Sequence, residues 1–239
     1  TNWPASGLYL NAKVSISANI MRVGERFSFL LAEAEEWTPG PAPVSWGIDS
    51  LKKGLARFRE AAAGRLPGEG LGSLINPGGG PFNEQAVWTI AERPVKELAG
   101  WLAASFREPG GKITKGLRWA HSLLGMGPGL TPSGDDFLGG MMIALHCLAE
   151  PAICRSLWAS CRRLAFATGN PVAYAHLAAA AEGLASAGIH QALAAIMEGR
   201  AEAVGSILDA IDAIGHTSGW DAMAGAVTAF DAWIKAQNH

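Results

Sequence analysis

Residues 137–149, FLGGMMIALHCLA, form the longest apolar run of the chain and stand between Asp136 and Glu150. A helix that is apolar on every side must be buried, because no face of it favours contact with water. The run is also shorter than the roughly 20 apolar residues that a membrane-spanning helix needs. It therefore predicts a buried central helix, around which the rest of a soluble domain packs.

The sequence on both sides of this run predicts further helices. Apolar residues recur at helical spacing in residues 49–63, 94–107, 112–124, 153–164, 173–187, 189–197, 204–211 and 221–236. Glycines follow several of these segments, as expected at helix ends. The connections are short, which favours antiparallel neighbours in a helical bundle.

The first part of the chain has a mixed character. Residues 8–10, 14–16 and 27–31 are β-prone and suit short strands. Loops rich in proline and glycine occupy residues 37–43, 66–72 and 76–81. The composition changes near Pro109-Gly110-Gly111. We therefore predict an α+β chain, with a mixed α/β region over residues 1–110 and a mainly helical bundle over residues 111–239.

The composition limits the kinds of partner. The 239 residues are 49% hydrophobic and 17% charged, which excludes a disordered chain. The net charge of -2 gives no electrostatic reason to expect nucleic acid or an anionic membrane. Cys147, Cys154 and Cys161 form no CxxC pair, so we expect buried thiols in a reducing compartment rather than disulfides or a metal site. No signal peptide is visible, and we expect a cytoplasmic protein.

Residues 125–140, GMGPGLTPSGDDFLGG, lead into the central helix and carry the clearest functional signal. Ser133 followed by Asp136 resembles a capping box, which would make Gly134 and Asp135 the first helical residues. Capping alone explains the serine and one aspartate. It does not explain a second carboxylate beside the first, because adjacent carboxylates repel each other, even though a helix N-terminus stabilises each by roughly 0.3–1 kcal/mol. A functional role is the alternative.

Two familiar glycine-rich motifs are excluded here. A Walker loop needs a lysine that is missing, and a dinucleotide fingerprint needs a third glycine where Leu130 stands. A bare helix N-terminus binds anions, but two carboxylates oppose a naked phosphate. They suit a ligand that carries a cation, donates N–H groups, or reaches only the loop amides of residues 127–130.

Residues 215–225, GHTSGWDAMAG, repeat the same pattern. The SGWD of residues 218–221 matches the SGDD of residues 133–136, and a threonine, Thr131 or Thr217, stands within two residues before each serine. Two unrelated helix caps would also contain serine and aspartate. The glycines at the same offset favour two helix N-termini that face one ligand site.

Two further residues are candidates for the site. His216 stands at the start of the second motif, where it either bonds to nearby backbone or contacts a ligand and transfers a proton. Thr168 begins a third helix start, Thr168-Gly169-Asn170-Pro171. There Asn170 can cap the helix and Pro171 suits its first position, so an ordinary helix start explains this segment as well.

The two motifs together resemble the paired signatures of a bacterial family named after AllH, a subunit of oxamate carbamoyltransferase. The resemblance covers roughly residues 112–235. It implies a role in allantoin-type purine catabolism, in which oxalurate and phosphate exchange with oxamate and carbamoyl phosphate, together with two partner subunits. The motif positions that it implies are Gly127, Gly129, Thr131, Ser133, Gly134, Asp135, Asp136, His216, Ser218, Gly219 and Asp221.

The resemblance suggests chemical roles for these residues. Carbamoyl transfer requires stabilisation of charge on the carbonyl oxygen and on the departing phosphate. We expect the loop amides through Leu130 and the hydroxyls of Thr131 and Ser133 to donate hydrogen bonds. Asp135 or Asp136 would hold the amide of oxamate or a metal such as Mg²⁺, and His216 would pass a proton. The remaining candidate ligand contacts are Thr168 and Thr217.

Two other functions stay open at this point. The chain could be a non-catalytic module that senses a small carboxylate or amide through the same loop. It could also be a structural assembly subunit. The sequence leaves the cofactor and the metal requirement unknown.

Overall fold

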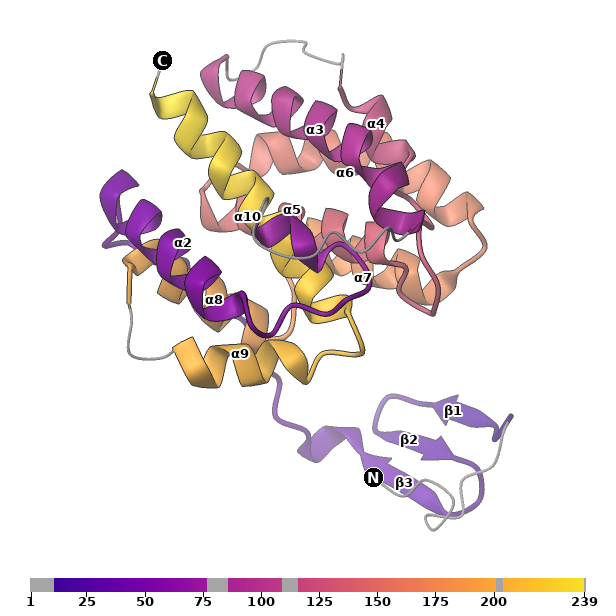
Figure 1. Ribbon diagram of the computed structural model, residues 1–239. Coiled ribbons are helices and arrows are strands. Elements are labelled where there is room, and N and C mark those ends of the chain that lie inside the picture. The colour runs from indigo at the N-terminus through magenta and orange to yellow at the C-terminus, as the bar shows by residue number, and fades with distance from the viewer. Residues whose placement is uncertain (1–10, 77–85, 109–115, 201–203, 239) are drawn as a thin grey trace. The chain divides into compact units, whose positions relative to one another are not determined.

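The computed structural model describes residues 11–76, 86–108, 116–200 and 204–238. Contacts divide the chain into two compact units, Thr1–Thr38 and Pro39–His239. The change of composition predicted near residues 109–111 lies outside the described residues, so the predicted boundary between regions 1–110 and 111–239 stays a prediction. The α+β class is confirmed: a small sheet precedes a mainly helical part (Figure 1).

The first unit contains a three-stranded antiparallel sheet in the order β1-β2-β3. Its elements are β1 (Val14–Ile16), β2 (Ile20–Val23), β3 (Phe27–Leu30) and the short 3₁₀ helix η1 (Leu31–Glu33). Val14 pairs with Val23, and Ile20 pairs with Leu30. The strands predicted at 14–16 and 27–31 are confirmed, although the latter strand ends at Leu30, one residue earlier than predicted. The strand predicted at 8–10 lies outside the described residues.

The second unit is helical. Its elements are α2 (Ile48–Ala62), η2 (Gly72–Ile75), α3 (Ala86–Arg107), α4 (Arg118–His121), α5 (Ser133–Cys147), α6 (Pro151–Ala167), α7 (Pro171–Ala181), α8 (Ala187–Glu198), α9 (Val204–Asp212) and α10 (Ser218–Gln237). In Figure 1, α10 crosses α5 in the middle of this unit, with α2, α8 and α9 on one side and α3, α4, α6 and α7 on the other. Within the described part of the chain, no helix is long and apolar enough to cross a membrane.

Helix α5 is the predicted central helix. Phe137, Leu138, Met141, Met142 and Leu145 are fully buried, because other helices cover every side of it. Burial of each such side chain contributes roughly 1.5–3 kcal/mol relative to exposure. The apolar run was therefore a correct indicator of the core.

Two glycines allow α5 and α10 to touch backbone to backbone. A Cβ atom added at Gly140 would overlap the carbonyl oxygen of Ala222, and one added at Gly225 would overlap the carbonyl oxygen of Phe137. Any larger residue at either position would push the helices apart. This close contact brings the first turns of both helices together.

Several predicted boundaries shift for local reasons. Helix α3 begins at Ala86 and continues through Pro94, where the sequence predicted its start. The amide that Pro94 lacks would have bonded to the carbonyl of Ile90, whose side chain is exposed, so the missing bond falls on the surface side of the helix. Helix α7 ends at Ala181, before the predicted end at residue 187, because Gly183 adopts a φ of 82°. Of the helix predicted over residues 112–124, only α4 is regular among the described residues.

Candidate functional site

Helix α5 begins one residue earlier than the sequence predicts. Ser133 is already helical, Pro132 is the N-cap residue, and no side chain caps the helix. The amides of Asp135 and Asp136 both donate to the carbonyl of Pro132, at 2.9 and 3.0 Å. The predicted capping box between Ser133 and Asp136 is therefore wrong, because backbone groups close the first turn. Both side chains remain available for other contacts.

Helix α10 begins in the same way. Thr217 is its N-cap residue without a side-chain cap, and Ser218 is its first helical residue. The amide of Asp221 donates to the carbonyl of Thr217 at 2.9 Å. The sequence repeat is thus also a structural repeat, with serine at the first helical position and aspartate at the fourth.

The two helix starts exchange hydrogen bonds across their contact. The carboxylate of Asp136 on α5 accepts from Ser218 on α10, and from Thr131 just before its own helix. The carboxylate of Asp221 on α10 accepts from Ser133 on α5, and from Thr217 before its own helix. The pairing is reciprocal: each helix start supplies a serine to the other helix's aspartate.

Burial dominates the electrostatics of these carboxylates. It raises the pKa of Asp136 to about 7, against hydrogen bonds from Ser218 and Thr131 that lower it, while the charge of Asp221 raises it further. Burial also raises the pKa of Asp221, whose side chain is fully buried. In each of these two carboxylates, Oδ2 is buried without a hydrogen-bond partner. A buried acceptor without a donor is costly, so these two oxygens destabilise the ionised form of each carboxyl group.

Asp135 has a different environment from its neighbour. Its side chain is 5% exposed, and it accepts a hydrogen bond of 2.8 Å from the amide of Gly125. Burial raises its pKa, and the bond from Gly125 opposes that shift. Asp135 therefore closes the ten-residue loop that leads into α5, where Gly125, Gly127 and Gly129 all have positive φ.

A loop far away in the sequence covers Asp221. The amide of Leu71 donates to Oδ1 of Asp221 at 2.5 Å, and the amide of Gly72 also contributes. Gly70 has a φ of 75°, and a Cβ there would lie 2.5 Å from the same oxygen. The sequence analysis described residues 66–72 only as a loop. The glycines on either side of Leu71 were a signal that backbone approaches another group closely.

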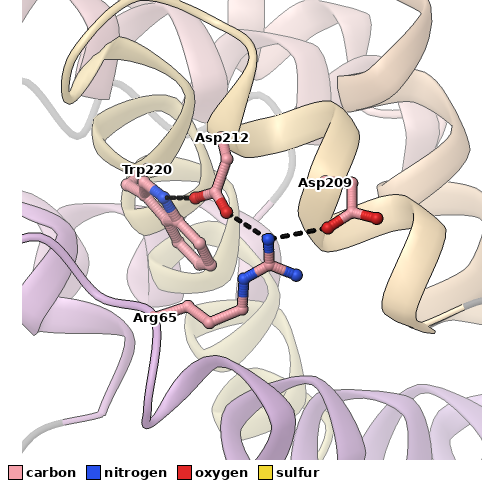
Figure 2. Close-up of polar contacts among 4 residues, drawn as sticks. All are labelled: Arg65, Asp209, Asp212 and Trp220. Carbon is pink, nitrogen blue, oxygen red and sulfur yellow. Dashed lines mark hydrogen bonds and ion pairs between the residues drawn. The ribbon is translucent and has the colours of Figure 1, made fainter.

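A polar cluster holds this loop and the start of α10 in place (Figure 2). Nε1 of Trp220, the residue before Asp221, donates to Oδ1 of Asp212 at 2.7 Å. Arg65 bonds to the other oxygen of Asp212 and to Oδ1 of Asp209, the latter at 2.7 Å. Phe58 of α2 stacks on the indole of Trp220, with ring centroids 6.4 Å apart. The tryptophan of the second motif is thus held by one hydrogen bond and one ring contact.

Two adjoining cavities meet at the paired helix starts. The inner cavity, about 260 Å³, is lined by polar residues that include Asp135, Asp136, His176 and Ser186, and by apolar side chains that include Ile143, Leu177 and Ile189. The outer cavity, about 560 Å³, is lined by Glu69, Gly70, Pro128, Gly129, Leu130, Thr131, Ser133, Gly215, His216, Thr217 and Ser218. Thr131, Gly215 and Ser218 border both cavities. The hydroxyls of Thr131 and Ser218, 3.0 Å apart, stand between them.

The structure places most of the predicted site residues at these cavities. Asp135, Asp136, Gly129, Leu130, Thr131, Ser133, His216, Thr217 and Ser218 line one or both. Gly134 and Gly219 instead pack closely against the carbonyls of Leu123 and Ile211. Gly127 packs against Ser133, where an added Cβ would lie 3.0 Å from the amide nitrogen. These three glycines shape the site by allowing close packing.

His216 stands at the rim of the outer cavity. Its side chain is 83% exposed, and its Nε2 lies 3.5 Å from Oε2 of Glu69. The two residues come from the two loops that flank this cavity. A ligand in the outer cavity would meet the imidazole, whereas the buried carboxylates lie deeper.

The third helix start supports the motif loop. Asn170 caps α7 as predicted, accepting from the amides of Val172 and Ala173. Its Nδ2 also donates to the carbonyl of Leu130 at 2.8 Å. Thr168 donates to the carbonyl of Ala165 at 2.7 Å and so belongs to the end of α6. This segment positions the loop that forms the wall of the outer cavity.

The described residues include no group of three or more His, Cys, Asp or Glu side chains arranged to hold a metal ion. All three cysteines are buried and free.

The fold and the site define a helical protein whose polar centre is built from two interlocked helix starts. Residues 123–230, which include both motifs, match the family described as oxamate carbamoyltransferase subunit AllH. Neither the curated proteins nor the solved structures gave a match.

Proposed function

We propose that this chain is the small-ligand-binding subunit of an oxamate carbamoyltransferase-like enzyme in allantoin and purine catabolism. The enzyme would convert oxalurate and phosphate into oxamate and carbamoyl phosphate, with partner subunits completing it. The observation that carries the proposal is the pair of carboxylates at the interlocked helix starts, in the segment that matches the family: Asp136 lines the inner cavity, and Asp221 is covered by the loop at Leu71. We expect the complete enzyme to act in the cytoplasm.

The size and lining of the cavities suit this substrate class. Sites for drug-sized ligands have roughly 300–1,000 Å³, so an inner cavity of about 260 Å³ has room for a small ligand. Oxamate is such a molecule. The outer cavity is larger and is bordered by glycine backbone, hydroxyl groups and two helix N-termini, which favour anions. A phosphate or carboxylate group there would lie beside His216.

The residues would divide the chemistry between them. Backbone amides near Gly129 and Leu130, with the hydroxyls of Thr131 and Ser218, would stabilise negative charge that develops on the transferred group. His216 would give or take a proton at the outer cavity. Asp136 would contact the part of the substrate that enters the inner cavity.

A second candidate function is a non-catalytic binding module. The observation that favours it is the exposure of His216, which lies beside Glu69 at the cavity rim. In that case the same cavities would bind a small carboxylate or amide, and the partner subunits would perform the reaction.

The test is to measure oxamate carbamoyltransferase activity of the chain assembled with its partner subunits. We expect Asp136→Asn to lower kcat/KM by about 100-fold or more, as loss of a group that orients the substrate does. His216→Ala should also lower it if the histidine transfers a proton. The matched control is Asp49→Asn, an exposed aspartate in the first turn of α2. Normal turnover by the partner subunits alone would contradict the catalytic proposal and favour the binding module.

A further inference from the structure

The two halves of the site are related by an approximate two-fold axis. Equivalent positions are 85 residues apart, since 218 − 133 = 85, 221 − 136 = 85 and 225 − 140 = 85. Gly140 packs on the carbonyl of Ala222, and Gly225 packs on the carbonyl of Phe137, which is the position equivalent to Ala222. Contacts that repeat with their partners exchanged are the signature of a two-fold interface.

The side chains obey the same relation. Ser218 bonds to Asp136, and the equivalent Ser133 bonds to the equivalent Asp221. A threonine before each helix adds a second bond to its own aspartate. The environments of the two carboxylates can therefore be compared directly, as two copies of one site.

The two copies differ in the surroundings of the aspartate. Asp221 is fully buried because the loop at residues 69–72 covers it, and the amide of Leu71 donates to its Oδ1. Asp136 lines the inner cavity of about 260 Å³, whereas Asp221 lines neither cavity. One half of the site is thus filled by the protein's own backbone, while the other half opens on a cavity.

The filled half shows which chemical group this arrangement accepts. A carboxylate oxygen surrounded by apolar atoms needs a donor, and hydrogen bonds to a charged acceptor are worth more than neutral ones. At Asp221 that donor is a backbone amide, an N–H group beside a planar carbonyl. A primary amide or carbamoyl group presents the same N–H at similar size. Ile143, Leu177 and Ile189 supply apolar walls for such a group, and the lining also includes the polar residues Asp135, His176 and Ser186.

We propose that Asp136 accepts a hydrogen bond from the NH₂ group of a small primary amide, in the place that the Leu71 amide takes at Asp221. This inference rests on the proposed function and specifies the orientation of the ligand in its site. The amide end lies in the inner cavity against Asp136. The charged end points past Thr131 and Ser218 toward the outer cavity, where backbone amides and helix N-termini stabilise an anion.

The test compares two ligands of nearly equal size on the full chain. Oxamate carries the NH₂ group, and oxalate has an oxygen in its place. By isothermal titration calorimetry, we expect the wild-type chain to bind oxamate at least about tenfold more tightly than oxalate. Asp136→Asn should remove or invert this preference, because the Asn amide can donate to oxalate. Asp231→Asn, exposed at the far end of α10, is the control and should keep the preference.

A second measurement does not depend on a variant. In the wild-type chain, the NH₂ protons of ¹⁵N-labelled oxamate should become protected from exchange with water when the ligand binds. Equal affinity for oxamate and oxalate, binding of neither at millimolar concentration, or exchange as fast as in free oxamate would each overturn the inference. So would an oxamate preference that Asp136→Asn leaves intact.

Activity of the assembled enzyme separates this inference from the proposed function. Turnover with no oxamate preference in the chain would overturn the orientation at Asp136 but leave the proposed function standing. A clear preference that depends on Asp136, in an assembly that does not transfer carbamoyl groups, would support the site and overturn the enzyme assignment.

Discussion

The hydroxyl oxygens of Thr131 and Ser218 lie 3.0 Å apart, although 87 residues separate them in the sequence. This contact joins the loop before α5 to the first residue of α10. Both residues border both cavities, and both bond to Asp136. The pair therefore controls the polar junction through which the inner and outer cavities communicate.

A double-mutant cycle at this pair tests whether the two helix starts are energetically coupled. We expect Thr131→Val and Ser218→Ala each to destabilise the protein by about 0.5–1.5 kcal/mol, the typical loss for one hydrogen bond. The double variant should lose less than the sum, because each single change already breaks the shared contact. Urea unfolding gives the free energies of unfolding. Strictly additive losses would mean that the hydroxyl contact contributes nothing.

The glycines at the crossing of α5 and α10 should tolerate no side chain. Gly140→Ala and Gly225→Ala each place a Cβ on a backbone carbonyl of the facing helix, which cannot rotate away as a side chain could. We expect a loss of roughly 3 kcal/mol or more in the free energy of unfolding, or failure to fold.

Gly139 on the same helix is the matched control for these changes. The nearest atom to a Cβ added there is Cβ of Ala180 at 3.6 Å, an ordinary van der Waals contact. Gly139→Ala should be neutral or stabilise by up to about 1 kcal/mol, because alanine favours helix. Equal thermal melting of Gly140→Ala and Gly139→Ala would contradict the close crossing of the helices.

The sequence predicted the central helix and the pairing of motifs because both depend on local pattern. An apolar run without charge must be buried wherever it goes, and the repeated Ser-Gly-x-Asp stands at the starts of α5 and α10. The end of α8 at Gly199 and the start of α7 at Asn170 were predictable because glycine and asparagine favour those positions. The class of fold was accessible for the same reason.

The partners of the motif residues were not predictable from local pattern. Ser133 and Asp136 have the spacing of a capping box, yet each bonds to the other helix, because Pro132 leaves its carbonyl to close the first turn. The loop at Leu71 reaches Asp221 across 150 residues. Such contacts depend on how the helices pack, which no single segment encodes.

The indole of Trp220 allows a matched test of the cluster in Figure 2. Asp209 and Asp212 both lie on α9 and both contact Arg65, but Asp212 also accepts from the buried Trp220. Asp212→Ala leaves that indole N–H without an acceptor and should cost about 1–3 kcal/mol. Asp209→Ala removes only an exposed ion pair and should melt close to the wild type. Thermal unfolding of both variants distinguishes them, and equal effects would argue against a role for the indole bond.

The thiols should be unreactive in the folded protein. Burial raises the pKa of Cys147 and Cys154 to about 11 and that of Cys161 to about 12, and only the thiolate is a nucleophile. Titration with Ellman's reagent at neutral pH should therefore proceed only slowly, and all three thiols should react rapidly once the chain is unfolded in guanidinium. Rapid reaction of the folded chain would show that at least one of these cysteines is accessible.

The raised pKa of Asp136 predicts how stability depends on pH. Its value of about 7 in the folded chain exceeds the ordinary 3.8, so between these pH values the folded state holds a proton that the unfolded state releases. The stabilisation of the folded state by this proton is fully present below pH 3.8 and is lost as the pH rises to about 7. Its size is a few kcal/mol. The free energy of unfolding of Asp136→Asn should therefore increase relative to that of the wild type as the pH is raised from 5 to 8.

Urea unfolding at several pH values measures this difference, with Glu60→Gln on the surface of α2 as the control that should keep a constant offset. The same titration bears on ligand binding. If Asp136 accepts from a primary amide, its ionised form is the better acceptor, so oxamate should bind more tightly at pH 8 than at pH 6. A stability difference between wild type and Asp136→Asn that does not change with pH would mean that this carboxylate titrates as it does in water, and the case for a desolvated acceptor at the inner cavity would then be lost.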